Sequence, residues 1–162
     1  MKPLRLPAEQ LAFMKRGVSV IVGSRDAQLR PSIMRAVGSS VAGDGSEITV
    51  FLARPQARQL LQDIAATGWI AVVFSEPSTH RSLQLKATRS TQRDATPADA
   101  VLLERYLASL ERELGCVGIP APVGRAMLAH RIEDLVAVSF TPEQAFEQTP
   151  GPRAGTAMGG SA

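Results

Sequence analysis

The sequence predicts a mainly β fold with some α-helix (α+β), in which six mostly antiparallel strands form a small barrel with flanking helices. Segments of strand length are joined by turns of the hairpin type, such as Gly43-Asp44-Gly45. Helices that would connect parallel strands are few. A barrel this small is open or split along one side, so its strand edges and apolar strips need cover.

The length of 162 residues fits one domain. We assign it to residues 1–155 and treat residues 156–162 as a flexible C-terminal tail. No apolar run is long enough to cross a bilayer and no signal peptide is evident, which predicts a cytoplasmic protein outside the membrane. The net charge is only +3, without a concentrated basic stripe, so nucleic acid is not an expected partner.

In the first half of the chain, residues 7–16 predict a short helix that ends at Gly17. β-Branched residues and turn signals then predict three strands and a second helix. Pro55 fits the first helical position, and Gly68 lies just past the end. The predicted strands are residues 18–22, 32–41 and 47–53, and the second helix is residues 55–66.

In the second half, residues 69–74 form a continuous apolar run, typical of a strand covered on both faces. Residues 81–90 alternate between apolar and polar and predict another strand. Residues 97–114 predict the longest helix, with Thr96 as its N-cap and Gly115 as its stop. Residues 132–140 predict the last strand, and residues 149–162 should be irregular.

Two strands carry more apolar residues than one barrel interior needs. Ile48, Val50 and Leu52 share one face of their strand, whereas Phe51 lies on the other. The 69–74 run is apolar on both faces. One of these faces must be covered either by the helices or by a second subunit, and the helix at residues 97–114 can cover only part of it. A second copy of the chain would bury the remainder, which predicts a homodimer.

Arginines suggest a phosphate site. Arg35 shares a strand face with Ile33 and Val37, and this face is either interior, where the guanidinium needs an anion, or exposed, where Arg35 is unremarkable. Arg54 and Arg58 flank a predicted helix N-terminus, which favours phosphate. Together the three arginines outline a phosphate cradle.

Other chemistries lack their motifs. The chain has no phosphate-binding loop, no glycine-rich dinucleotide motif and no nucleophile elbow. His80, His130 and Cys116 lack the spacing of metal ligands, and no metal is expected. Cys116, the only cysteine, has no local motif and is predicted to be buried. With no evident nucleophile, a cofactor is expected to supply the chemistry.

Several segments resemble one family. Residues 30–37 resemble the FMN-contacting second strand of the pyridoxamine 5′-phosphate oxidase-like superfamily. Residues 51–54 with the following helix resemble its phosphate-closing segment, and residues 80–87 resemble its later flavin-reaching strand. The ending around residues 140–152 is similar to the tail of uncharacterised members. Arg54-Pro55-Gln56 stands where oxidases of the type family have a Ser-Arg-Lys-like run.

The resemblance implies a six-stranded antiparallel split β-barrel that binds FMN between the subunits of a homodimer and acts as an oxidoreductase on a small-molecule substrate or electron donor. The tail at Pro150-Gly151-Pro152 would close over the flavin. Two alternatives remain: a haem-binding or haem-degrading split barrel, and a flavin-binding or sensing module without turnover. The resemblance identifies no catalytic residue. It implies cofactor contacts from Ser32, Met34, Arg35, Ala36, Val37, Phe51, Leu52, Arg54, Arg58, Arg81 and Ser82.

Overall fold

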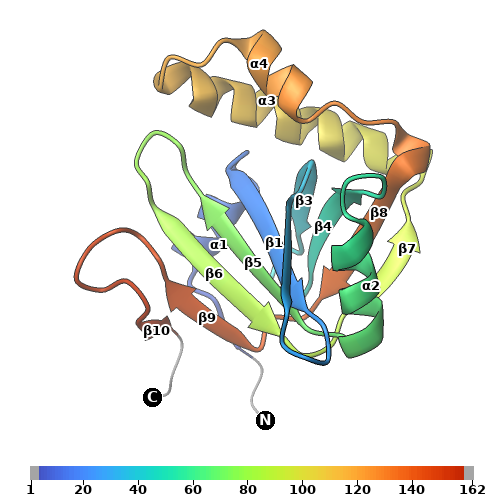
Figure 1. The fold of residues 1–162 in the computed structure, drawn as a ribbon. Helices are drawn as coiled ribbons and strands as arrows, with labels where there is room; N and C mark the ends of the chain where they lie inside the picture. The colour runs from blue at the N-terminus through green and yellow to red at the C-terminus, as the bar shows by residue number, and fades with distance from the viewer. Residues whose placement is uncertain (1–3, 159–162) are drawn as a thin grey trace.

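The computed structural model describes residues 4–158, in which two antiparallel sheets enclose the core of a split barrel (Figure 1). The first sheet has the order β10-β9-β6-β5-β1-β2, and the second has the order β3-β4-β8-β7. The predicted α+β class and antiparallel barrel are confirmed. The strands are β1 (Ser19–Arg25), β2 (Pro31–Arg35), β3 (Gly38–Val41), β4 (Ile48–Ala53), β5 (Ile70–Ser75), β6 (Ser82–Ala87), β7 (Thr91–Asp94), β8 (Leu135–Phe140), β9 (Gln144–Glu147) and β10 (Ala157–Met158).

The chain passes from one sheet to the other between β2 and β3. The Ala36 N–H donates to the Val20 carbonyl in the six-stranded sheet (2.9 Å). The next N–H, that of Val37, donates to the Phe51 carbonyl in the four-stranded sheet (2.8 Å). One continuous strand was predicted here, because the residues are extended throughout. The change of partner at this point divides it into two strands.

Four helices flank the barrel in the described residues. Helix α3 runs across one end of the barrel and α4 folds back along it, whereas α2 lies against β1 and β2 (Figure 1). Helix α1 contacts β3. Short 3-10 turns at Pro97–Asp99 and Ile132–Asp134 precede α3 and β8. The helices are α1 (Ala8–Lys15), α2 (Arg58–Thr67), α3 (Ala100–Cys116) and α4 (Ala121–Met127).

The main core lies between the inner faces of the two sheets. Alternation along each strand supplies it, with every second residue turned inward. From the six-stranded sheet come residues such as Val20, Val22 and Phe74, and from the four-stranded sheet Val50 and Leu52. Helices α1 and α2 add their apolar sides. The face that Ile48 was predicted to share with Val50 and Leu52 is the interior one.

A second, smaller core lies on the outer face of the four-stranded sheet, beneath α3. Its centre is Phe51, which is only 1% exposed and packs with Leu103 of α3 and with Ala137 of β8. A Cβ on Gly38 would lie 2.5 Å from a Leu103 methyl group, so α3 sits directly on the start of β3. The apolar residue predicted on the second face of β4 is thus covered by a helix of the same chain.

Gly17 was predicted to end the first helix, and the structure gives it a further role. It follows α1, and its N–H donates to the Ser109 hydroxyl of α3 at 2.8 Å. A Cβ at this position would lie 2.4 Å from the Leu110 backbone nitrogen. Only glycine permits this close approach of α3 to the backbone that leads into β1.

Several elements of the structure were not predicted from the sequence. Strand β7 has four exposed residues and therefore no apolar alternation. Strand β9 and the two-residue β10 form a hairpin in the region around the predicted irregular end. Helix α4 contains Gly124 and follows Pro120, two residues that weaken a helix signal. Residues 159–162 of the predicted tail lie outside the described residues.

Three local predictions need correction. Helix α2 begins at Arg58, because Arg54 to Gln56 form a turn; Pro55 is therefore not at the first helical position. Strand β5 is buried on one face only, so its apolar run is not covered on both sides by this chain. Cys116 is the last residue of α3 and is exposed, because the helix continues through Gly115.

Candidate functional site

The outer face of the six-stranded sheet has no helix over it in the part of the chain that the structure describes. This is the side of β1, β5 and β6 that faces the viewer in Figure 1. The residues turned outward on the central strands include Ile21, Ala71 and Val73, all half-buried. On the edge strand β2, Ile33 is 68% exposed. An apolar sheet face of this kind marks a binding surface for a ligand or a partner.

A row of polar side chains crosses one end of this face. Arg35 of β2 donates from Nη1 to the Ser19 hydroxyl of β1 at 2.5 Å. Ser19 is opposite Ser75 of β5 in the sheet register. The Ser75 and Ser82 hydroxyls lie 2.8 Å apart on β5 and β6. We call Arg35, Ser19, Ser75 and Ser82 the arginine–serine row; it offers a guanidinium and three hydroxyls on four neighbouring strands.

Arg35 therefore lies on the outer face of the sheet and not in the barrel interior. Ile33 shares this face, but Val37 does not, because the chain has by then changed sheets and Val37 lies in the small core beneath α3. Ser19 takes one of the five guanidinium N–H groups, and no other residue between 4 and 158 bonds to the rest, which are open to an anion. The row thus retains hydrogen-bonding capacity.

Helix α3 reaches the barrel end near the row through Tyr106. The buried Tyr106 hydroxyl donates to the Val18 carbonyl at 2.5 Å. Burial raises the pKa of this phenol, and the positive charge of Arg35 opposes the increase. Tyr106 is therefore a neutral hydrogen-bond donor that fixes α3 on the backbone just before Ser19.

The C-terminal hairpin borders the other end of the row. The Ser82 N–H donates to the Thr149 hydroxyl at 3.0 Å, and the Gln148 N–H donates to the Ser82 carbonyl at 2.9 Å. The predicted closing segment, Pro150-Gly151-Pro152, starts immediately after Thr149 in the loop between β9 and β10. This places the start of that loop beside the row.

At the opposite end of the outer face lies a groove of about 810 Å³. Trp69, Leu29 and Ile33 line it, and all three are large exposed apolar residues. The Arg25 guanidinium lies over the Trp69 ring at 3.8 Å. Lys86, the second cation of the groove, has its amino group 4.7 Å from the centre of the Phe146 ring. The groove therefore combines an apolar floor with cations near its rim.

The other predicted cofactor residues are dispersed. Arg54 forms an exposed ion pair with Asp94 of β7 (2.5 Å), and Arg58 is exposed at the start of α2. Arg81 bonds to Glu9 at 3.0 Å and lies over the Phe13 ring. Within residues 4–158, Arg35 and Arg54 share no hydrogen-bond or ion-pair partner, since Arg35 bonds to Ser19 and Arg54 to Asp94. Two of the remaining members are half-buried: Met34 packs against the main core, and the Ser32 hydroxyl donates to Asp63 of α2 at 2.5 Å. The other four are buried in the two cores: Ala36, Val37, Phe51 and Leu52.

Sequence reasoning missed Ser19 and Ser75. Each is a small polar residue in a β-branched run and has no motif around it. Alternation could have placed Ser19 on the same face as Ile21, but only the strand order brings both serines next to Arg35 and Ser82. Of the predicted residues, the row unites Arg35 and Ser82.

Metal and membrane signatures are absent from the residues described. No group of three or more histidine, cysteine or carboxylate side chains within residues 4–158 is arranged to hold a metal ion. His80 has a left-handed backbone (φ 61°) in the turn before β6, and His130 is exposed. In the same range, no helix combines the length and apolarity that a membrane crossing requires.

Comparison with solved structures places this fold among known proteins. No protein-family model matches the chain, and no curated protein matches it. A putative pyridoxamine 5′-phosphate oxidase from Lactobacillus delbrueckii is similar over 90% of this chain and 97% of its own, with 14% identity and a TM-score of 0.57.

Two further structures are similar at equally low identity. One is a pyridoxamine 5′-phosphate oxidase-related, FMN-binding protein from Nostoc punctiforme (13% identity, 90% of this chain and 83% of that one, TM-score 0.50). The other is HutZ, a haem storage protein from Vibrio cholerae (14% identity, 89% of this chain and 95% of that one, TM-score 0.51). Identities this low establish the architecture alone. The chain therefore has the split-barrel fold of the pyridoxamine 5′-phosphate oxidase-like proteins.

Proposed function

We propose that this chain binds FMN on the outer face of the six-stranded sheet and acts as a flavin-dependent oxidoreductase. The observation that carries the proposal is the arginine–serine row at one end of an uncovered apolar sheet face. The row can bind the polar end of an amphipathic ligand, and the apolar side chains beside it can contact the rest of that ligand. FMN has this division, with a phosphate at one end and a flat ring system at the other.

The row suits the phosphate end. Hydrogen bonds from a guanidinium to phosphate are charge-assisted. The Ser19 hydroxyl accepts from Arg35, so its own hydrogen can be donated to the same phosphate. Because Ser19 holds one Arg35 nitrogen, part of the side-chain entropy of Arg35 is already lost before a ligand binds. Residues Ile21, Ala71 and Val73 suit the ring, because they present half-buried apolar surface without charges.

When bound, the flavin supplies hydride or electron transfer to a small-molecule substrate or electron donor. The contribution of this chain is to bind and orient the cofactor and to exclude water from one side of the ring. The outward side chains of β1 and β5 do this through their apolar surface. The loop that follows Thr149 is suited to limit access, since it begins beside Ser82.

A homodimer follows from the same surface. Ile33, Leu29 and Trp69 are exposed in the single chain, and β2 is an edge strand with free backbone groups. A second copy that packs on this face would cover both the apolar residues and the ring. The proposed flavin site would then lie between the subunits. The neighbour described as FMN-binding supports this assignment by its fold.

The test compares FMN with riboflavin, which lacks the phosphate. FMN should bind more tightly, and Arg35→Ala should weaken FMN binding by about 1.5–3 kcal/mol, the usual contribution of a hydrogen bond to a charged group. Riboflavin affinity should change little. Fluorescence quenching of the flavin measures both. Gln62→Ala, an exposed change on α2, is the control.

Arg54→Ala decides the extent of the phosphate site. Unchanged FMN affinity would confine the phosphate to the arginine–serine row, whereas a loss as large as that of Arg35→Ala would restore the predicted cradle of Arg35, Arg54 and Arg58. Equal affinity for FMN and riboflavin would refute both versions. Bleaching of the bound flavin by NAD(P)H would separate an oxidoreductase from a module that only stores or senses flavin.

Haem is the second candidate ligand, and the position of His80 beside the arginine–serine row favours it. The Ser82 hydroxyl donates to the His80 carbonyl at 3.0 Å, so this histidine stands at the border of the row. Neutral imidazole is a common haem ligand. A Soret band that appears on haem addition and is lost in His80→Ala would support this function, and FMN binding without a Soret band would exclude it.

A further inference from the structure

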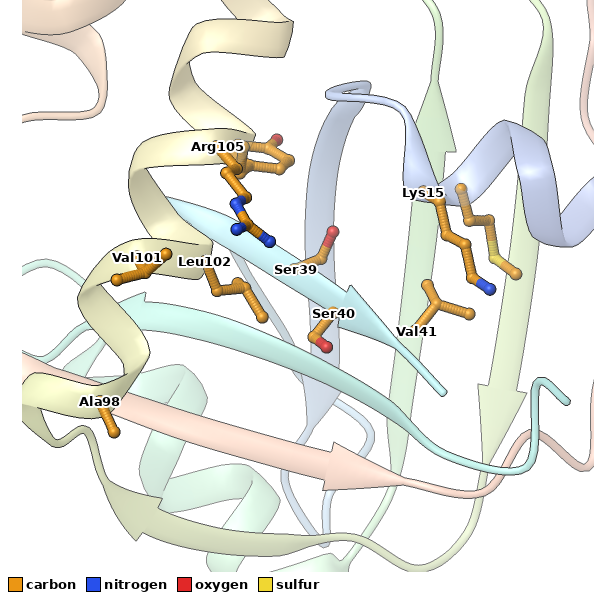
Figure 2. Close-up of a pocket in the computed structure, with 10 residues that line it drawn as sticks. Lys15, Ser39, Ser40, Val41, Ala98, Val101, Leu102 and Arg105 are labelled. Atoms are coloured by element: carbon orange, nitrogen blue, oxygen red, sulfur yellow. The ribbon is translucent and has the colours of Figure 1, made fainter. Parts of the chain in front are cut away.

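A second pocket, separate from the outer face of the six-stranded sheet, lies where α1, β3 and α3 meet. Its volume is about 420 Å³. Figure 2 shows Arg105 of α3 on one side and Lys15 of α1 on the other, with Ser39 and Ser40 of β3 between them. No member of the arginine–serine row lines this pocket.

The two cations of the pocket lack counterions. Neither Lys15 nor Arg105 forms an ion pair or a side-chain hydrogen bond with another described residue, and the pocket lining contains no acidic side chain. The adjacent Arg16, in contrast, pairs with Glu76 at 2.9 Å. Two unneutralised positive charges beside one concavity raise the local concentration of anions.

Strand β3 adds donors to the same pocket. It is the edge of its sheet, and the Ala42 N–H donates toward β4, to the Glu47 carbonyl (2.9 Å). Since these directions alternate along an antiparallel strand, the N–H groups of Ser39 and Val41 point to the free edge. The Ser39 hydroxyl is buried and has no partner among the described residues. Buried hydroxyls normally have one, so a ligand or water is needed here.

The remaining wall is apolar. Val101 and Leu102 of α3 and Val41 of β3 line the pocket beside the polar groups. Val101 is 56% exposed although it is a large apolar residue. A bare inorganic ion would leave this surface in contact with water, whereas a ligand with an apolar body would cover it.

We propose that this pocket binds a small organic anion. Its phosphate or carboxylate group lies between Lys15 and Arg105 and accepts hydrogen bonds from the edge of β3. Its apolar body packs against Val101 and Leu102. The site acts in addition to the proposed flavin site and does not depend on it, because the two share no residue.

Calorimetric titration of the whole protein tests this site with three probes of one shape. Phenyl phosphate, benzoate and benzyl alcohol carry a phosphate, a carboxylate and a neutral group on similar rings. At least one anion should bind, and the stronger of the two assigns the anion class. Benzyl alcohol should bind about tenfold more weakly or not at all. Equal binding of all three probes, or none, would overturn the proposal.

Charge-removing variants locate the site. Arg105→Gln and Lys15→Gln should each weaken anion binding about tenfold. Arg112→Gln is the matched control, since Arg112 is an exposed arginine of the same helix outside the pocket. An equal loss in the control would show general attraction by a basic surface and refute the pocket. FMN affinity should be unchanged in Arg105→Gln, so failure here and failure of the flavin proposal are distinguishable.

Discussion

The two sheets differ in whether a helix covers their outer face. On the four-stranded sheet, α3 covers Phe51 and Ala137, and the packing produces a second small core. On the six-stranded sheet, the corresponding side is left without a helix, and Ile33 remains 68% exposed. Both faces carry apolar residues at alternate positions. The first face therefore contributes to the stability of the single chain, whereas the second leaves apolar surface open to a ligand or a partner.

The largest effect expected from this contrast is on stability. Phe51→Ala should lower the free energy of unfolding by about 3–5 kcal/mol, because it leaves a cavity beneath α3. Ile33→Ala, on the open face, should change it by less than about 0.5 kcal/mol in the monomer. Urea unfolding at low protein concentration measures both. Comparable losses in the two variants would remove the distinction between the faces.

The second largest effect is expected on the dissociation constant of the proposed homodimer. Ile33→Asp places a charge on the face proposed to pack in the homodimer, where an unpaired buried carboxylate is costly. The dissociation constant of the dimer should rise at least about 100-fold, a change of about 2.7 kcal/mol. Light scattering should then give the single-chain mass of 17.2 kDa.

Val123→Asp serves as the control for that experiment. Val123 is also an exposed apolar residue, but it lies on α4, away from the six-stranded sheet. Its substitution should leave the dimer intact. If wild type already scatters as a monomer, the open face has another occupant.

A smaller effect concerns the attachment of the covering helix. Asp99, in the turn before α3, accepts two hydrogen bonds from the Arg93 guanidinium of β7, and these lower the pKa of the carboxyl from 3.8 to about 2. Because the folded-state pKa is the lower one, this stabilisation is complete above about pH 5 and declines as the pH falls from 4 toward 2. Asp99→Asn should cost about 1 kcal/mol at pH 7, since half of the Arg93 side chain is exposed to solvent.

The measurement that checks this is the difference in the free energy of unfolding between wild type and Asp99→Asn as a function of pH. Urea unfolding of wild type and Asp99→Asn should give a gap that narrows between pH 5 and pH 3. A gap that stays constant would mean that Asp99 acts through its neutral hydrogen bonds to Thr96 and not through its charge.

The smallest effect is expected from Arg54→Ala. Its ion pair with Asp94 is exposed on both partners, and such pairs contribute about 0.5 kcal/mol or less. Thermal unfolding should therefore barely shift. A clear loss of stability would show that the edge strand β7 depends on this pair, and the covered sheet would then be held partly from its edge.

Alternation and turn residues were sufficient to predict most of the barrel. Strand β6 was predicted from its period-two pattern, and Gly68 ends α2 as expected with a φ of 74°. Strand β7 gave no signal, because a fully exposed edge strand buries nothing and needs no apolar residue. The change of sheet after Arg35 was also invisible, because both halves are equally extended.

The candidate site was predictable only in part. Arg35 was a candidate from its strand position and Ser82 from the resemblance, and the structure brings them onto one face. The grouping of Arg35 with Arg54 relied on their nearness in sequence and on an assumed helix start at Pro55. In the structure, Arg54 forms an exposed ion pair with Asp94 of β7, a strand that was not predicted. Its part in a phosphate site therefore stays a prediction, which Arg54→Ala tests. Long-range strand pairing supplied Ser19 and Ser75.

The strand order has a consequence for synthesis on the ribosome. Strands β1, β2, β5 and β6 neighbour one another and are complete once residue 87 has emerged. Strand β4 pairs with β8 on one side, where Ile48 lies opposite Phe140. Until Phe140 has been translated, that edge of β4 has no partner, and the apolar side chains of β8 are missing from both cores. We expect nascent chains shorter than about 140 residues to engage chaperones through β4, since unpaired strand edges and exposed apolar surface are what such factors recognise.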